Sequence, residues 1–518
     1  MKVSIKKTII PLVLMIAFLF SNTYTTEAST LTELESKYDI ELKKGSIINI
    51  KDSGATGDGK TDDTASIQKS LNKVSKKKNI VYFPKGEYMI NANDSESTEE
   101  MVRRFANPDV GLKVSSNTTI VMDEEAYVKV IPNEFYSYTV FNLGDVENVS
   151  IYGGNIVGDR NDHLKKYPKL RRGDPEYNGE TGWGILMKSS ENILIDDINI
   201  QDMWGDAIDL FASKESTKPN KDIVIRNSVL SNNRRQGISI ENVENLVIEN
   251  NIIKGTKGTD PSAGVNIEPA DFKHHNLRSA KNIKIRNNQF LDNDDAGVLL
   301  YGMGTRIFYD KDDAGNQQGA IIDDIEITNN LFKGNNTNHQ NVQDGAWKGA
   351  YNGQLMIVGA SNVVVKNNNL EDPKPLGSMD NTNVKARFEP NSNPTAGILV
   401  GYSEGITIED NAMPKQDVSV INQWSVPETF AYPNSVNIKV KNNEMNEVVK
   451  ASGEDNNPDV EEEGVTDKSK IGIKADENNK DETHEKDKKD KKDSSEVTEE
   501  KDQGFFRSVW NKIKSFFS

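Results

Sequence analysis

Three acidic side chains, one in each of three similar short segments, have the spacing that acid–base chemistry on a sugar polymer needs. They are Asp209 in "GDAIDLFA", Glu241 in "RQGISIEN" and Glu268 in "SAGVNIEP". If these segments are neighbouring parallel strands about 4.8 Å apart, the carboxyls of Glu241 and Glu268 lie about 5 Å apart and those of Asp209 and Glu268 about 9.6 Å apart. The shorter separation suits retaining glycoside hydrolysis and the longer one suits inversion through a water molecule.

We therefore expect Glu268 to act with either Asp209 or Glu241 as the acid/base or nucleophile pair. Like charges at this separation raise the pKa of one carboxyl, which supplies a protonated acid beside an ionised base. Asp206, at the entrance of the strand that contains Asp209, is expected to position a water molecule. A plain solvated acidic face remains an alternative, because the formal net charge is -17.

The residues expected to bind substrate are aromatic, basic or amide-bearing and lie near these carboxyls. They are Lys188, Trp204, Phe211, Arg234, Arg235, Gln236, Asn266 and Tyr301. Aromatic faces stack on sugar rings, although each aromatic taken singly could equally pack in the core or a loop. The arginines suit a carboxylate or phosphate. His274 and His275 are expected to be structural or solvent-facing; no spacing suggests zinc, and any metal is unknown.

A recurrent segment along the chain indicates how these residues are held. It reads apolar, any residue, apolar, then a polar corner often made of Asn, as in "ENILIDDINIQD", "ENLVIENNIIKG", "KNIKIRNNQFLD" and "SNVVVKNNNLED". Between copies lies a second strand such as "GWGILMKS" or "DAGVLLYG". Period-two alternation predicts strands, and Asn tolerates the left-handed backbone of a tight corner. Coils of this kind bury their apolar side only by stacking, so we predict a parallel β-helix with asparagine ladders.

Alternation in the second strands sends one pair of side chains per coil outward. The expected pairs are Leu186 and Lys188, Asp209 and Phe211, Ser239 and Glu241, Asn266 and Glu268, Leu299 and Tyr301, Met356 and Val358, and Leu399 and Gly401. The middle pairs are polar and the flanking pairs are mostly apolar. We therefore expect a polar track on one outer face of the helix.

The segment "INIKDSGATGDGKTDDTASIQKSLNKV" is expected to close the open end of the solenoid. It combines a Gly-rich loop with a helix capped near Thr61 or Asp62, and Ile67 and Leu71 lie on one helical face. The loop lacks the Gly-Lys-Ser/Thr ending of a phosphate loop, so no nucleotide site is expected.

The stretch "GATGDGKTDDTASIQKSL … VYFPKGEYMI" resembles the N-terminal signature of the pectate-lyase-like superfamily of right-handed parallel β-helices. That superfamily includes polygalacturonases, pectate lyases, alginate epimerases and phage tailspike depolymerases. The resemblance spans about residues 45 to 447 and implies an all-β, single-stranded right-handed parallel β-helix with an N-terminal capping helix.

Within this superfamily, "WGDAIDL" resembles the Gly-Asp-Asp-Cys-Ile segment of the polygalacturonases of glycoside hydrolase family 28, which places the second Asp at Asp206. "RQGISI" resembles their Gly-His-Gly-Ile-Ser-Ile segment with Gln236 at the histidine, and "GVNIEP" replaces Arg-Ile-Lys. Trp183 stands where an Asp of the Asn-Thr-Asp segment would fall. The remaining carboxyls resemble the acidic clefts of tailspike-type depolymerases more than a polygalacturonase site.

The two ends of the chain predict export and surface attachment. Residues 1–28 run from basic to apolar to small residues, as a signal peptide does, with cleavage near Ala28. The β-helix is expected over residues 29–448, a charged disordered linker over 449–503, and a short basic amphipathic helix over 504–518. Residues 505–517 are expected either to adsorb to a membrane or envelope surface or to dock on the body.

The residues and their pattern leave three functions open. The first is an exported glycoside hydrolase that acts on an extracellular polysaccharide without a cofactor. The second is a lyase in which the carboxylates hold Ca²⁺ and Arg234, Arg235 or Lys188 abstracts a proton. The third is a non-catalytic surface protein that binds glycans. The acidic charge argues against nucleic acid as a partner, and the oligomeric state is not specified.

Overall fold

The computed structural model describes residues 31–467 in a set of ranges. Residues not described within them are 41–45, 78, 94–108, 134, 136, 164–180, 213–217, 260, 270–277, 303–320, 336–352, 373–395, 402, 414–417, 423–435, 446–447, 451–459 and 464–465. The expected signal peptide (1–28), His274, His275 and the expected amphipathic helix (504–518) lie outside the described residues.

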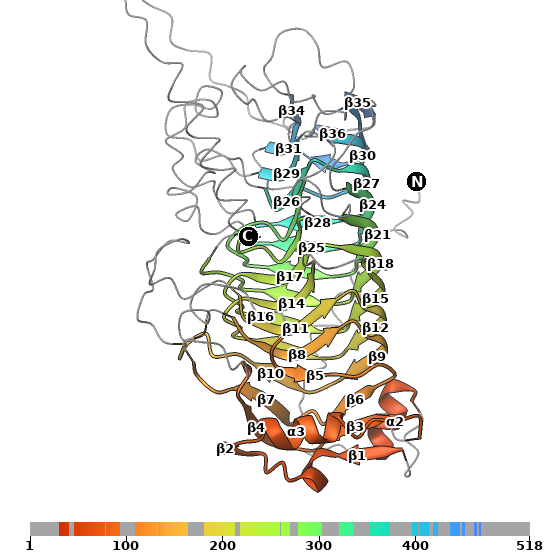
Figure 1. Cartoon of the computed structure of the whole chain (residues 1–518). Helices are drawn as coiled ribbons and strands as arrows, with labels where there is room; N and C mark the ends of the chain where they lie inside the picture. The colour runs from red at the N-terminus through yellow and green to blue at the C-terminus, as the bar shows by residue number, and fades with distance from the viewer. Residues whose placement is uncertain are drawn as a thin grey trace, which may run out of the picture.

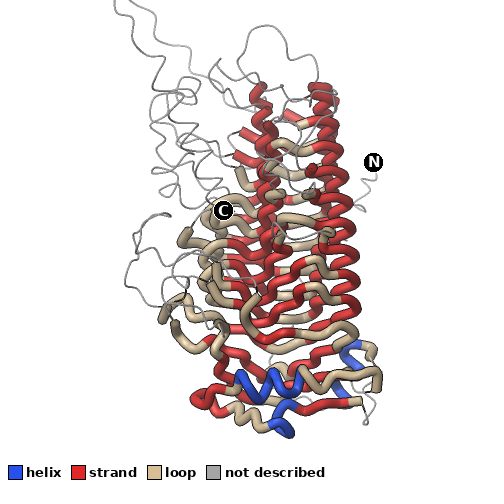
Figure 2. Tube along the Cα trace, viewed as in Figure 1, coloured by secondary structure: helices blue, strands red, loops and turns tan. Residues whose placement is uncertain are grey.

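In the described residues, parallel strands stack into three long sheets that wind around one core, which is the expected right-handed parallel β-helix (Figures 1 and 2). Sheet 1 contains β1 (Ile47–Asn49), β3 (Ile80–Phe83), β6 (Thr119–Met122), β9 (Glu147–Tyr152), β12 (Glu191–Asp196), β15 (Asn220–Arg226), β18 (Val243–Glu249), β21 (Ser279–Arg286), β24 (Ile321–Thr328), β27 (Ser361–Lys366), β30 (Glu404–Glu409), β32 (Val436–Lys441) and β35 (Val460–Glu463).

Sheets 2 and 3 form the other two sides. Sheet 2 contains β2 (Asp58–Asp62), β4 (Gly86–Ile90), β7 (Ala126–Val130), β10 (Asn155–Val157), β13 (Asn199–Gln201), β16 (Val229–Ser231), β19 (Ile252–Lys254), β22 (Gln289–Leu291), β25 (Leu331–Lys333) and β28 (Asn369–Glu371). Sheet 3 contains β5 (Leu112–Lys113), β8 (Thr139–Gly144), β11 (Trp183–Lys188), β14 (Asp206–Phe211), β17 (Gln236–Ile240), β20 (Val265–Ile267), β23 (Val298–Tyr301), β26 (Leu355–Val358), β29 (Ala396–Gly401), β31 (Val418–Asn422) and β34 (Val448–Lys450). A short pair, β33 (Glu444–Met445) and β36 (Thr466–Asp467), completes the stack.

The core follows from alternation in register. Ile193 pairs with Ile223, and Ile223 with Leu246, so equivalent side chains lie above one another along the axis. Phe290 and Phe332 continue such a row as stacked rings whose centroids are 4.9 Å apart. Each coil therefore buries its apolar side on the next one, and no single coil has a core of its own.

The expected asparagine ladders form at the corner between sheets 1 and 2. A buried ladder joins Asn251, Asn288, Asn330, Asn368, Asn411 and Asn443 through side-chain bonds of 3.0 to 3.1 Å. The residue before each ladder position adopts the left-handed backbone, as at Asn329 with φ 57°. Asn thus serves twice at each corner, once for the positive φ and once for the buried amide chain.

The N-terminal end is closed by α3 (Thr64–Leu71), which buries Ile67 and Leu71, next to the 3₁₀ turn η1 (Ile50–Ser53). The cap lies slightly later than expected: the helix begins after Asp63, whose carboxylate accepts hydrogen bonds from the N–H groups of Thr56 and Gly57. Asp63 therefore closes the Gly-rich loop, and the helix begins at the next residue, Thr64.

A helix that the sequence patterns did not predict, α2 (Leu31–Tyr38), packs outside sheet 1. Leu34 and Tyr38 contact an apolar outer patch that includes Val121 and Tyr152, and the Tyr38 hydroxyl donates to Asp197 over 2.9 Å. At the other end, β35 and β36 lie inside the segment expected to be a disordered linker, so the β-helix continues past residue 448.

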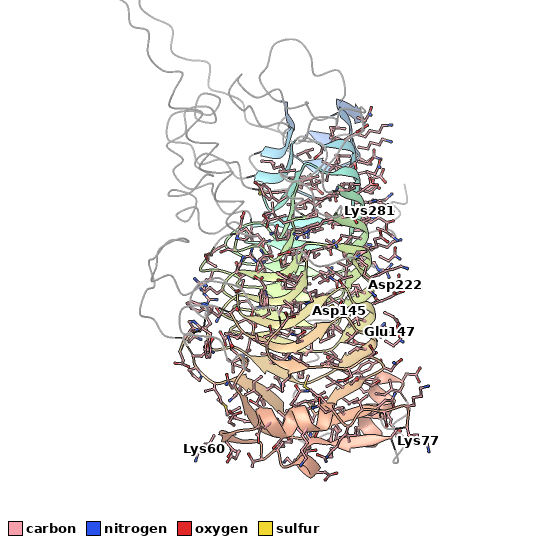
Figure 3. The ribbon with its side chains drawn as sticks, in the orientation of Figure 1. Lys60, Lys77, Asp145, Glu147, Asp222 and Lys281 are labelled. Carbon is pink, nitrogen blue, oxygen red and sulfur yellow. The ribbon has the colours of Figure 1, made fainter. Side chains whose placement is uncertain are left out.

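The outer side of sheet 1 carries charged side chains, among them Glu147 and Lys281, and Asp222 lies at its edge (Figure 3). The connection from sheet 1 to sheet 2 is a tight corner, as between Asp196 and Asn199. The connections that flank sheet 3 differ widely in length: β10 ends at Val157 and β11 begins at Trp183, whereas β17 ends at Ile240 and β18 begins at Val243. Insertions in a solenoid gather around one face, commonly the binding face, so sheet 3 is where a site is expected.

Candidate active site on the outer face of sheet 3

The register of sheet 3 confirms the expected outward positions. Ala207, Ile208 and Leu210 belong to the core, so Asp206, Asp209 and Phe211 lie on the other side of β14. Three outer rows follow from the strand pairing, namely Trp183, Asp206 and Gln236; then Leu186, Asp209, Ser239, Asn266 and Leu299; and then Lys188, Phe211, Glu241, Glu268 and Tyr301. The central part of these rows is called the polar patch below and consists of Asp206, Asp209, Gln236, Ser239, Glu241, Asn266 and Glu268.

Asp206 and Arg235 form a buried ion pair at the entrance to the patch. Arg235 Nη1 lies 2.9 Å from Asp206 Oδ2, and the two side chains are 7% and 0% exposed. A charge this far from water requires a close counter-charge, and each residue supplies it for the other. Asp206 therefore contributes to a fixed buried pair at the position where we expected it to hold a water molecule.

Asp209 is the most perturbed carboxyl of the patch. It is buried, and its Oδ1 atom has no hydrogen-bond partner among the described residues. Burial raises its pKa well above the ordinary value, the charges of Glu241 and Asp206 raise it further, and Arg235 and the Ser239 hydroxyl only partly oppose this. Burial and the neighbouring negative charges therefore both favour the protonated form of Asp209.

Glu241 is placed one coil further along and reaches toward solvent more than Asp209. Its side chain is 12% exposed, its Oε2 accepts a hydrogen bond from the Ala212 N–H over 3.0 Å, and Arg278 Nη1 lies 4.0 Å away. Burial raises the pKa of Glu241 to about 7, and the Arg278 guanidinium and the Ala212 N–H limit the rise. A carboxyl with a pKa near neutrality is suited to general acid catalysis.

Glu268 lies in the next coil beside Glu241. Its N–H donates to Ile240 O over 2.8 Å, which places it directly opposite Glu241 at about the strand spacing of 4.8 Å. Asn266 Nδ2 donates to Glu268 Oε2 over 2.9 Å and orients the carboxylate. The Glu268 charge also raises the pKa of Glu241, so the two groups influence each other electrostatically.

Comparison with known proteins agrees with the observed architecture. Residues 47–289, which include the whole polar patch, match the model of the family described as "Rhamnogalacturonase A/epimerase, pectate lyase-like". This part of the chain is similar to the pectate lyase-like superfamily, as the sequence resemblance implied, and the expected parallel β-helix is confirmed.

Individual relatives share about half of their length with the chain. The Bacillus subtilis protein YclG, named as uncharacterized, is 35% identical over 300 residues, which are 56% of this chain and 48% of YclG. Plasmin and fibronectin-binding protein A of Streptococcus pneumoniae is 23% identical over 436 residues, 72% of this chain and 56% of that protein. The β-helix described above is therefore compared with only part of each of these proteins.

Among solved structures, the chain shows a distant likeness to the family 28 exopolygalacturonase of Yersinia enterocolitica. The TM-score is 0.48 and the identity 15%, with 82% of this chain and 78% of that chain covered.

Trp204 of the β-helix does not offer a stacking face to a sugar, contrary to expectation. The His163 ring stacks on it with centroids 3.9 Å apart, and the Arg234 guanidinium carbon lies 3.8 Å from the ring centre. Two planar groups this close occupy the two opposite faces of the indole. His163 Nδ1 is 2.8 Å from Asp159 Oδ2, and the Tyr138 hydroxyl accepts from the backbone N–H of Trp204 over 3.0 Å. Arg234 is likewise engaged in this packing.

Other expected binding residues lie at the border of the polar patch. Lys188 pairs with Asp109 over 2.8 Å, and Phe211 lies against Trp183 with ring centroids 5.8 Å apart. Tyr301 packs on an apolar outer cluster that contains Ala263, Ala296, Leu299, Met356, Val358 and Leu399. The patch is therefore bordered by one cation, by aromatic rings and by aliphatic side chains.

The sequence patterns gave no role to two residues at the polar patch, Arg278 and Ser239. Arg278 is buried and faces Glu241, but it follows a long connection and no repeat pattern marks it. Ser239, which lowers the pKa of Asp209, was expected to point outward but was not assigned a role. The position of Ser239 in register with Asp209 was the available signal, whereas Arg278 required the tertiary structure.

The described residues contain no group of three or more His, Cys, Asp or Glu side chains arranged to hold a metal ion. Arg235 and Arg278 also lie among the carboxyls and provide counter-charges there. In the same part of the chain, no helix has both the length and the apolar character needed to cross a membrane.

Proposed function

We propose that this protein is a glycoside hydrolase that acts on a polysaccharide, with Glu241 as the general acid and Glu268 as the nucleophile or base. The observation that carries the proposal is the placement of these two carboxyls in adjacent coils, with the pKa of Glu241 raised to about 7 and the carboxylate of Glu268 held by Asn266. We thus propose Glu241, and not Asp209, as the second catalytic carboxyl beside Glu268. Asp209 is 2% exposed, so Glu241, whose side chain is 12% exposed, is the better placed of the two to give a proton to a substrate.

The chemistry follows from the two protonation states. Protonated Glu241 gives its proton to the glycosidic oxygen as the bond to the anomeric carbon breaks, while ionised Glu268 attacks that carbon from the other side. Glu241 then takes a proton from the water that cleaves the glycosyl–enzyme bond. Carboxyls that follow the strand spacing of about 4.8 Å would suit this retaining course. Asp209 affects the reaction through its electrostatic interaction with Glu241.

The similarity to the rhamnogalacturonase A/epimerase family supports a polysaccharide as the substrate, because the matched residues 47–289 contain both glutamates. We further propose that the protein is exported and acts outside the cell or at its surface. The signal-like residues 1–28 support export, and a relative whose name records binding of plasmin and fibronectin supports an extracellular setting.

The decisive test is incubation of the mature chain with neutral and uronate polysaccharides, with reducing ends and ultraviolet absorbance read together, in the presence and absence of a chelator. We expect new reducing ends without absorbance and without an effect of the chelator. Glu241→Gln and Glu268→Gln should each lower kcat by about 100-fold or more. Glu244→Gln, on the outer side of sheet 1, is the matched control and should retain full activity.

Absorbance that a chelator abolishes would replace the hydrolase with the Ca²⁺-dependent lyase. A second candidate, a non-catalytic binding protein, is favoured by the 72% coverage of the chain in the match to plasmin and fibronectin-binding protein A. Binding of glycan with neither new reducing ends nor ultraviolet absorbance would support that candidate and reject the hydrolase.

A further inference from the structure

The polar patch contains hydrogen-bond acceptors that nothing in the described part of the protein satisfies. Asp209 Oδ1, Gln236 Oε1 and Asn266 Oδ1 are buried oxygens without a partner among the described residues, and Gln236 Nε2 is a donor in the same condition. The three side chains are between 0% and 2% exposed. Buried polar atoms are nearly always paired, so this cluster indicates a ligand with several donors.

The strand register places these side chains on three successive coils. Gln236 is next to Asp206 in the first outer row, and Ser239 lies between Asp209 and Asn266 in the second. Asp209 and Asn266 therefore lie in the row next to Glu241 and Glu268, while Gln236 lies about 10 Å earlier along its strand. A pyranose presents hydroxyl or amino donors on successive carbons, which matches a set of acceptors distributed over neighbouring strands.

The cations around the patch already face carboxylates or an indole. Arg235 is paired with Asp206 at 2.9 Å, Arg278 faces Glu241 at 4.0 Å and Lys188 is paired with Asp109 at 2.8 Å. Arg234 lies on Trp204 and donates to its carbonyl oxygen. A carboxylate on the ligand would share these cations with the carboxylates already beside them and would lie close to Glu268.

The net charge of the whole chain also disfavours an anionic ligand. The formal net charge is -17, which repels a polyanionic chain at long range. A neutral polymer meets no such barrier, and a cationic one is attracted.

We propose that the sugar bound over Asp209, Gln236 and Asn266 carries no carboxylate and is either a neutral hexose or an amino sugar. This inference rests on the proposed function, since it names the substrate class of the same site. It departs from the uronate-containing substrates that a polygalacturonase-like β-helix would suggest. Hydroxyl or ammonium hydrogens of the sugar fill the open acceptors, and its ring oxygen or a hydroxyl accepts from Gln236 Nε2.

The experiment measures initial rates of the mature chain on a neutral β-glucan, on partially deacetylated chitosan, and on polygalacturonate and alginate. In parallel, oligosaccharides of equal length from each polymer compete for binding to the Glu268→Gln variant. We expect turnover and competition with the glucan or chitosan series at least 10-fold stronger than with the uronate series. A preference for chitosan over glucan identifies an amino sugar, and the reverse preference identifies a neutral hexose.

A variant pair tests the acceptor set directly. Gln236→Ala should raise KM about 10-fold or more on the best substrate with a smaller change in kcat, and Gln201→Ala, an exposed glutamine on the outer side of sheet 2, should leave both unchanged. If Gln236→Ala does not fold, the competition series on the Glu268→Gln variant decides the question alone.

The outcomes separate the two proposals. Turnover or binding that favours uronates overturns the substrate class and leaves the hydrolase intact. Binding of glucan or chitosan oligosaccharides with no turnover of any polymer rejects the hydrolase and upholds the substrate class. Absence of both binding and turnover across the panel overturns both.

Discussion

At the scale of single residues, burial controls the chemistry of the polar patch. Glu241 and Glu268 have the same functional group, yet burial among core-backed strands gives Glu241 a pKa of about 7, with Arg278 on its other side. Asp209 is buried more completely, and its pKa is raised well above the ordinary value. A short outer face thus holds carboxyls in different electrostatic environments, which is the arrangement that acid–base pairs require.

The raised pKa of Glu241 makes a pH-dependent contribution to stability. Because the folded pKa lies above the ordinary value of 4.5, the folded state binds this proton more tightly, so the contribution is complete below pH 4.5 and is lost as the pH rises through about 7. Glu241→Gln should remove this loss, which amounts to about 3 kcal/mol of the free energy of unfolding. Chemical denaturation at pH 4.5 and 8.5 measures it; an equal change with pH in both proteins would contradict the assignment.

The stack around Trp204 provides a second test at this scale. Arg234→Met keeps the aliphatic stem and removes the guanidinium from the indole face, so we expect a loss of about 1–2 kcal/mol in the free energy of unfolding. Arg286→Met, which breaks an exposed pair with Glu249 on sheet 1, serves as the control and should change stability by less than about 0.5 kcal/mol. Thermal denaturation compares the two. A larger loss in the control variant would show that the stack contributes little.

At the scale of elements, the corners between sheets 1 and 2 keep the coils in register. Asn330 donates to Asn368 Oδ1 and to Ile285 O, and it accepts from the N–H and the amide of Asn288. One side chain therefore links three successive coils inside the core. The asparagine pairs in the sequence predicted these corners, because Asn tolerates the left-handed backbone at the first position and supplies a buried amide at the second.

Asn330→Ala should lower the free energy of unfolding by about 3 kcal/mol, because it leaves buried groups of the neighbouring coils without partners. Asn329→Gly changes the preceding corner residue, which is exposed and has φ 57°, and should have little effect since glycine accepts this backbone freely. Urea denaturation distinguishes the two variants. Equal losses would mean that the corner conformation matters more than the ladder.

At the scale of the whole molecule, the site depends on the stack and not on one coil. The polar patch draws residues from β14, β17 and β20 and from the residues that follow them, and its cation Arg278 comes from the connection after β20. Several connections that flank sheet 3 are long, while sheets 1 and 2 meet at tight corners. The β-helix is thus a rigid support for one variable face.

The charged C-terminal sequence leads to a prediction about location. A mature chain that ends at residue 503 lacks the amphipathic segment 504–518, and if that segment adsorbs to an anionic surface the truncated protein should pass into the medium. Fractionation of cells and medium, with activity measured in each, tests this. A truncated protein that partitions as the full chain does would favour docking of the segment on the body.

The sequence by itself determined the fold and the location of the polar patch. Period-two alternation and asparagine corners recur from coil to coil, and these local preferences agree with the only packing that buries the apolar side. Because strand register follows from that repeat, the outward positions of Asp209, Glu241 and Glu268 were also predictable. The tertiary structure alone decided how each side chain is used. Arg278 reaches Glu241 from a connection without a repeat, His163 and Arg234 occupy the faces of Trp204, and Asp206 is paired with Arg235. Burial and charge pairing depend on groups far apart in the chain, which no local pattern records.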